Sequence, residues 1–177
     1  MGLQVAGDRS TTSEAYRALQ EARAVPPAGR RSVLVIDDEY GARLQVELAL
    51  MTSDSLTVVG MASNGSRGAE LAEALQPDVI VLDLSMPVMD GFEALPLLQA
   101  VAPRATILIR SGFDDEDSIL AAMRLGATAF LPKFLSPDGL RRIVERAAQG
   151  EASPRLVEAV RRARASRIES VRSAAGG

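Results

Sequence analysis

Short apolar runs alternate with longer segments of helical periodicity along the middle of this chain. The runs are rich in β-branched residues and apolar throughout, and the segments between them repeat apolar residues every three or four positions. Continuous apolar runs are typical of parallel strands that helices cover on both faces. The pattern therefore predicts an α/β fold with a doubly wound, five-stranded parallel sheet and five helices. The five runs are SVLVI (32–36), LTVVG (56–60), DVIVL (78–82), ATILIR (105–110) and ATAFL (127–131).

Two of the predicted helices carry informative boundary signals. In residues 64–76, Asn64 is suited to cap the helix start and Pro77 to end it. The segment after DGF contains Pro96, which we expect to kink that helix or to displace its start. The apolar face of the first of these helices is expected to consist of Ala69, Leu71, Ala72 and Leu75.

Composition divides the chain into three parts. Residues 1–30 are rich in small and hydroxyl residues and end in AVPPAGRR, which predicts a flexible N-terminal tail or linker. Residues 31–150 hold all the strand signals and form the expected domain. Residues 151–177 predict a helical C-terminal extension, with Val157, Val160, Ile168 and Val171 at roughly helical spacing. This extension could lengthen the last helix into a dimer contact, dock on a partner or link to an output domain, and we favour an exposed interaction helix.

The amino-acid composition excludes several kinds of chemistry. The 177 residues include no cysteine and no histidine, so disulfides, thiolate nucleophiles, sulfur-ligated zinc and histidine bases are excluded. A covalent nucleophile would have to be a carboxylate or a hydroxyl, and metal ligands would have to be oxygens.

Charge and hydropathy bear on partners and location. Residues 31–150 carry 10 basic and 17 acidic side chains, a net charge of −7, and the last 27 residues carry six arginines and three glutamates, a net charge of +3. The C-terminal segment carries a net charge of only +3, and the chain has only six aromatic residues. These features do not predict direct nucleic-acid binding. The N-terminus lacks the pattern of a secretory signal and no stretch reaches membrane-spanning length, so we expect a cytoplasmic protein without membrane contact.

Polar residues gather at the predicted carboxyl ends of the strands. Asp37 and Asp38 follow the first strand, Asp83 the third, Ser111 the fourth and Lys133 the fifth, and Lys133 is the only lysine beside nineteen arginines. Each alone has an ordinary structural explanation as a cap or turn residue. Together, three carboxylates at one rim would repel one another unless a cation joined them, which predicts a hard divalent ion. Mg²⁺ fits best and Mn²⁺ is the alternative.

Four motifs also carry a family resemblance. VLVIDDE, DVIVLDLSMPVMDG, ILIRSG and GATAFLPK, in this order and at these intervals, resemble the receiver domain of two-component response regulators. The resemblance covers about residues 31–150 and implies the flavodoxin-like strand order 2-1-3-4-5. The stretch GATAFLPKFLSPDGL is most similar to receivers that usually precede a helix-turn-helix output domain.

The resemblance implies a role for each rim residue. Asp83 would accept a phosphoryl group from a histidine of a partner kinase. Asp38, Asp83 and the backbone carbonyl of Ser85 would ligate Mg²⁺ directly, and Asp37 would act mainly through water. Lys133 would pair with Asp83 and then with the phosphoryl group.

The last two implied roles concern a switch. Ser111 would hydrogen-bond the acyl phosphate and Phe130 would reorient when Ser111 moves, although a core aromatic is an equal alternative for Phe130. Many receivers have tyrosine at the position of Phe130, so a switch here cannot use a phenolic hydrogen bond. Phe134 follows Lys133 where proline is frequent, which weakens the expectation of a cis peptide bond.

The sequence thus predicts a single-domain response regulator that catalyses its own phosphorylation and dephosphorylation. Its expected partners are a sensor histidine kinase or phosphotransfer protein and a downstream protein target, with homodimerisation left open. The alternatives are a phosphorylation-independent interaction module, the receiver fragment of a DNA-binding regulator that lost its output domain, or an aspartyl phosphatase. The phosphatase is disfavoured because Ser85 stands where a second carboxylate would be needed.

Overall fold

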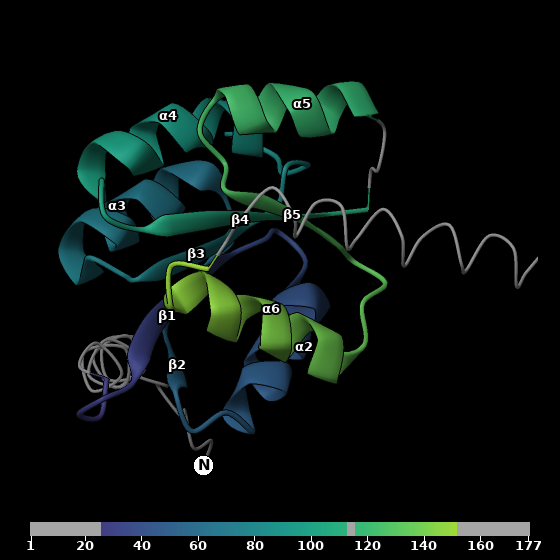
Figure 1. Cartoon of the computed structure of the whole chain (residues 1–177). Coiled ribbons are helices and arrows are strands. Elements are labelled where there is room, and N and C mark those ends of the chain that lie inside the picture. Colours follow the sequence, from purple (N-terminus) through teal and green to yellow (C-terminus); the bar gives the residue numbers. More distant parts are fainter. Residues whose placement is uncertain (1–25, 113–115, 152–177) are drawn as a thin grey trace, which may run out of the picture.

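The computed structural model describes residues 26–112 and 116–151 (Figure 1). Strands and helices alternate strictly within these residues, as the hydropathy pattern predicts. The elements are β1 (Arg31–Ile36), α2 (Tyr40–Met51), β2 (Leu56–Ala62), α3 (Gly65–Leu75), β3 (Val79–Leu82), α4 (Gly91–Val101), β4 (Thr106–Ser111), α5 (Glu116–Arg124), β5 (Ala129–Pro132) and α6 (Pro137–Ala148).

The five strands form one parallel sheet. Their order is β2-β1-β3-β4-β5, so the predicted order 2-1-3-4-5 is confirmed. β1 and β3 are direct neighbours, with Ile36 opposite Leu82 at their carboxyl ends. The order of the strands reverses beside β1, and this is the kind of position at which doubly wound sheets bind their ligands.

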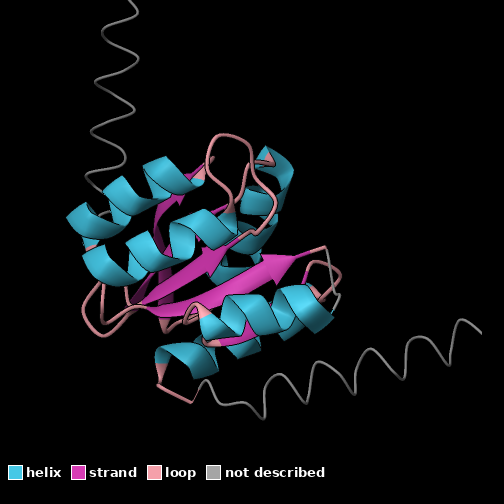
Figure 2. Ribbon diagram, turned by 90° about the horizontal axis from the view of Figure 1, so that it is seen from above, coloured by secondary structure: helices cyan, strands magenta, loops and turns pink. Residues whose placement is uncertain are grey.

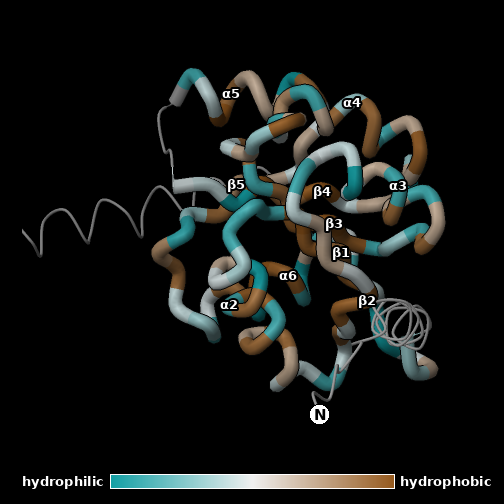
Figure 3. Tube along the Cα trace, turned by 180° about the vertical axis from the view of Figure 1, so that it is seen from behind, coloured by the Kyte–Doolittle hydropathy of each residue, from teal (hydrophilic) through white to brown (hydrophobic). Residues whose placement is uncertain are grey.

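Helices cover both faces of the sheet, as Figure 2 shows from above. Successive residues of a strand point to opposite faces, so Leu34 and Ile36 pack on the side of α3, α4 and α5, whereas Val33 and Val35 pack on the side of α2 and α6. This explains why the strand runs are apolar throughout. In Figure 3 the most hydrophobic segments accordingly lie at the centre, in the strands.

The predicted helix signals are confirmed at α3. The Asn64 side chain accepts a hydrogen bond from the Arg67 backbone N–H, and the helix ends at Leu75, before Pro77. Ala72 is completely buried, while Ala69 and Leu71 pack against the core from partly exposed positions.

Of the two effects expected of Pro96, a displaced helix start is not observed, and the kink stays a prediction. α4 begins directly after Asp90 and continues through Pro96 to Val101. A complete capping box fixes the start, because Asp90 accepts from the Glu93 N–H while Glu93 accepts from the Asp90 N–H. The buried residues Leu95 and Leu98 on either side of Pro96 hold the helix on the sheet. Capping and burial thus outweigh the hydrogen bond that proline removes.

The predicted N-terminal linker lies almost wholly outside the described residues, and so does the C-terminal extension with its expected helix. Within the described part of the chain, no helix combines the length and the apolar character needed to cross a lipid bilayer.

Candidate functional site

The carboxyl ends of β1, β3, β4 and β5 bring the predicted rim residues together. The Asp83 amide donates to the carbonyl of Ile36 (2.8 Å), which places Asp83 directly beside the end of β1. The Lys133 amide donates to the carbonyl of Ser111 (3.1 Å), which ties the end of β5 to the end of β4. Residues that lie far apart in the sequence, from Asp37 to Lys133, therefore meet in one small region. This is expected of parallel strands whose carboxyl ends lie at the same end of the sheet.

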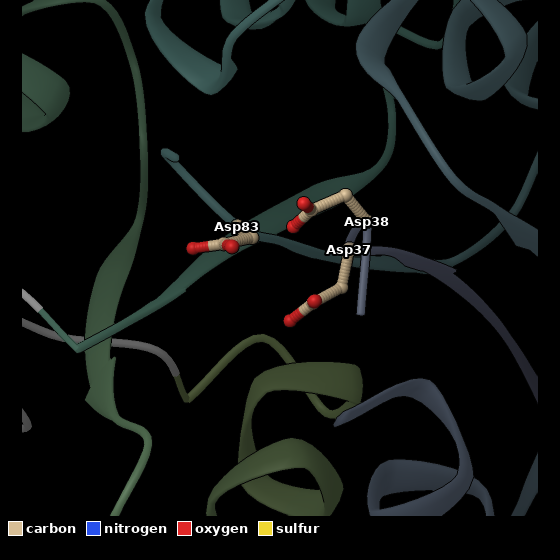
Figure 4. Close-up of side chains that lie close together, drawn as sticks. All are labelled: Asp37, Asp38 and Asp83. Carbon is tan, nitrogen blue, oxygen red and sulfur yellow. The ribbon is translucent and has the colours of Figure 1, made fainter. Parts of the chain in front are cut away.

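Three of the predicted carboxylates form a cluster, shown in Figure 4. One carboxylate oxygen from each of Asp37, Asp38 and Asp83 lies within 4.8 Å of the others. Asp37 and Asp83 are buried, with 3% and 2% of their surface exposed, while Asp38 is exposed. The cluster thus opens to solvent on the side of Asp38.

The backbone around the cluster is held from two directions. Arg43 in α2 donates from one guanidinium nitrogen to the carbonyls of Asp37 (2.6 Å) and Asp38 (3.0 Å), and the Glu39 amide donates to Asp37 Oδ1 (3.0 Å). After β3, the chain passes so close to Gly91 that an added Cβ would lie 2.7 Å from the Leu84 Cα and would also collide with the Asp83 carbonyl oxygen. Only glycine permits this approach, which fixes the backbone that carries Asp83.

Lys133 joins two of the carboxylates. Its ammonium lies 2.9 Å from Asp83 Oδ2 and 3.0 Å from Asp37 Oδ2. One cation therefore bridges two buried anions. The pairing with Asp83 is the contact that the family resemblance implied for Lys133. The additional contact with Asp37 was not predicted.

Burial and charge shift the pKa values of both partners. Burial raises the pKa of Asp83 above its ordinary value, and the neighbouring Asp37 charge raises it further, against the lowering effect of the Lys133 hydrogen bond. Burial alone would lower the pKa of Lys133, but hydrogen bonds to Asp83 and Asp37 raise it above its ordinary value. The cluster holds more negative charge than one ammonium neutralises.

The donor set fits a hard divalent cation. Asp83 Oδ1 is buried and makes no hydrogen bond to any described residue. The Ser85 amide lowers the pKa of Asp83 but does not form a hydrogen bond to this oxygen. A buried carboxylate oxygen without a partner is costly, and a bound cation would remove that cost. Carboxylate oxygens are also the ligands that Mg²⁺ and Mn²⁺ prefer. Ser85 itself is exposed in the loop between β3 and α4, and the role of its carbonyl stays a prediction.

Ser111 and Phe130 lie at adjacent strands. Ser111 is the last residue of β4 and is buried. Phe130 in β5 is 3% exposed, pairs with Ile109 and packs into the core beneath α4 and α5. In this conformation Phe130 is a core aromatic, and its role as a switch stays a prediction. No peptide bond between described residues is cis, and the bond between Lys133 and Phe134 is therefore trans.

The sequence reasoning missed Arg110 and Arg43. Arg110 is buried and lies 3.7 Å from Asp37 Oδ2, so a second cation faces the cluster. A signal for Arg110 was present, because it is a charged residue that ends the otherwise apolar run ATILIR. No comparable signal marked Arg43, which lies on a helix where an arginine is ordinary.

Comparisons with known proteins agree with this arrangement. Residues 33–145 match the response regulator receiver domain family. The chain is 39% identical over 120 residues to the nitrate/nitrite response regulator protein NarL of Escherichia coli (strain K12), covering 68% of this chain and 56% of that protein. It is 34% identical over 119 residues to the transcriptional regulatory protein LiaR of Bacillus subtilis (strain 168), covering 67% of this chain and 56% of that protein. The chain thus spans about half the length of the curated relatives it matches.

Solved structures include the signal receiver domain of the putative response regulator NarL from Mycobacterium tuberculosis. That domain superposes with a TM-score of 0.65 at 33% identity, covering 68% of this chain and 98% of that one. The chain therefore belongs to the response regulator receiver domain family. Receiver domains act in phosphorylation signalling, in which they interact with histidine kinases and phosphotransfer proteins.

Proposed function

We propose that this chain is a phosphorylatable receiver whose acceptor is Asp83. The observation that carries the proposal is the bridge from Lys133 to Asp83 and Asp37 inside a cluster of three carboxylates. A domain used only as an interaction module would gain nothing from two buried carboxylates, since their burial costs free energy unless it serves a site.

The chemistry assigned to Asp83 is nucleophilic. One carboxylate oxygen attacks the phosphorus of a phosphohistidine on a kinase or phosphotransfer protein, the phosphorus–nitrogen bond breaks, and the histidine nitrogen takes up a proton. Lys133 then pairs with the phosphoryl oxygens in place of the free carboxylate. Water later hydrolyses the acyl phosphate and restores Asp83.

Five further groups support this transfer. Asp38, Asp83 and the Ser85 carbonyl would hold Mg²⁺ or Mn²⁺, with Asp37 acting through water. When bound, the ion supplies positive charge opposite the transferred oxygens. The Ser111 hydroxyl donates to the acyl phosphate, and Phe130 responds to the movement of Ser111.

We further propose that residues 31–150 act as the signalling unit and that the output is a change in protein contacts. Residues 1–30 and 151–177 would flank this unit as a linker and a helical extension. The alternative is a receiver that works with a DNA-binding output domain, and the name of LiaR as a transcriptional regulatory protein favours it. Binding of the phosphorylated chain to DNA would favour the alternative.

Mass spectrometry after incubation with acetyl phosphate and Mg²⁺ tests the central proposal. The wild type should gain one phosphoryl group, and Asp83→Asn should gain none, because the amide is isosteric but not nucleophilic. Asp38→Ala should also fail, through loss of a metal ligand. Equal labelling of wild type and Asp83→Asn would place the acceptor elsewhere.

A further inference from the structure

Arg110 occupies an unusual place in the sheet. It lies two residues after Leu108 on β4, so its side chain leaves the strand on the face that α2 and α6 cover. Its side chain is only 5% exposed, compared with 24% for Lys133. A guanidinium this deeply buried requires a charged partner, since an unpaired buried cation is very costly.

The contacts of Arg110 direct it at the acidic cluster. One terminal nitrogen donates to Gln45 Oε1 in α2 (3.1 Å). The other lies 3.7 Å from Asp37 Oδ2 and makes no hydrogen bond to any described residue. Gln45 therefore holds one end of the guanidinium while the other end faces the carboxylate oxygen that Lys133 already contacts.

The charges around the cluster can now be added. Asp37, Asp38 and Asp83 contribute −3, and Lys133 and Arg110 contribute +2. The adjacent Glu39 and Arg43 contribute −1 and +1 and cancel, which leaves −1. Without Arg110 the same groups would leave −2. A cation entering the cluster is repelled by a guanidinium that Gln45 holds in place, and salt screens this repulsion little because Arg110, Asp37 and Asp83 are buried.

We propose that Arg110 is a buried counter-ion that lowers the affinity of the Asp37–Asp38–Asp83 cluster for divalent cations. This inference rests on the proposed function, because it takes the cluster to be the metal site. Arg110 would then set the Mg²⁺ concentration at which the chain can be phosphorylated. Arg110 acts through its charge beside Asp37 and does not contact the reacting atoms.

The direction of the effect separates this role from a structural one. If Arg110 merely held Asp37 in place, its removal would loosen the cluster and weaken metal binding. If Arg110 opposes the cation, its removal strengthens metal binding.

Calorimetric titration of Mg²⁺ at fixed ionic strength and the same pH for every protein tests the inference. Arg110→Met and Arg110→Gln should bind Mg²⁺ about tenfold more tightly than the wild type. Arg110→Lys keeps the charge and should stay close to the wild type. Arg67→Met removes an exposed arginine that pairs with Glu70 on α3 and should change nothing.

The outcomes distinguish this inference from the proposed function. Binding by Arg110→Met and Arg110→Gln that equals or falls below that of the wild type overturns the role of Arg110 and leaves the metal site intact. Should Arg110→Met fail to melt cooperatively, Arg110→Gln carries the comparison. If Arg110→Met and Arg110→Gln bind Mg²⁺ and the wild type does not, the result supports the inference in its strongest form. If none of the proteins binds Mg²⁺, the result overturns both the inference and the proposed metal site.

Discussion

Lys133→Met should destabilise the metal-free protein by removing the cation that bridges two buried carboxylates. Methionine keeps much of the length and apolar character of the lysine stem but carries no charge. Asp83 and Asp37 would then lose ammonium contacts of 2.9 and 3.0 Å in a region where their side chains are only 2% and 4% exposed.

The size of the loss follows from this geometry. Removing one partner of a buried ion pair typically costs 3–5 kcal/mol, because the remaining charge is left uncompensated. Two features reduce this figure here: Lys133 is 24% exposed, and Arg110 stays 3.7 Å from Asp37. We therefore expect a loss of about 2–3 kcal/mol in the free energy of unfolding, or roughly 6–12 °C in the melting temperature.

Urea unfolding followed by circular dichroism, with and without Mg²⁺, measures the effect. In EDTA the full loss should appear. Millimolar Mg²⁺ should recover most of it, because the variant site is more negative and an ion that binds only the native state stabilises it. Arg67→Met is the matched control, since an exposed pair is worth less than about 1 kcal/mol.

Two results would refute the reasoning. A loss for Lys133→Met no greater than that for Arg67→Met would show that the bridge does not stabilise the fold. A large loss that Mg²⁺ leaves unchanged would show that the cost is one of packing and not of uncompensated charge.

Two further predictions concern the same lysine and Asp78, which lies at the amino-terminal end of β3. Lys133→Arg should keep the fold and Mg²⁺ binding but lose most of the phosphorylation-dependent change in amide exchange at residues 111–135, because a planar fork does not fit where a compact ammonium does; a wild-type response would refute this. Burial alone would raise the pKa of Asp78, but hydrogen bonds from the Ser32 amide and hydroxyl and the pairing with Arg31 lower it below its ordinary value. Asp78 therefore contributes stability above the unfolded pKa of about 3.9 that is lost as the pH falls through the lower folded value. The stability difference between wild type and Asp78→Asn in urea should accordingly shrink between about pH 6 and pH 2, and a constant difference would contradict it.

The sequence by itself predicted the architecture and grouped most of the candidate site residues. Fully apolar runs such as 79–82 predicted buried parallel strands, and in a parallel sheet the residues that follow the strands meet at one edge. Asp37, Asp83 and Lys133 could therefore be grouped before any contact was known. Their local signals were strong because each comes at the end of a short, predominantly apolar run.

Only the tertiary structure decided how these groups pair. Arg110 and Gln45 are 65 residues apart, and Lys133 and Asp83 are 50 apart, so their contacts depend on how helices and strands pack and not on local pattern. Packing likewise placed Phe130 in the core and allowed α4 to continue as a helix past Pro96. Periodicity reports which face of an element is buried, but the distance between charged atoms on different elements follows from side-chain packing across the whole domain.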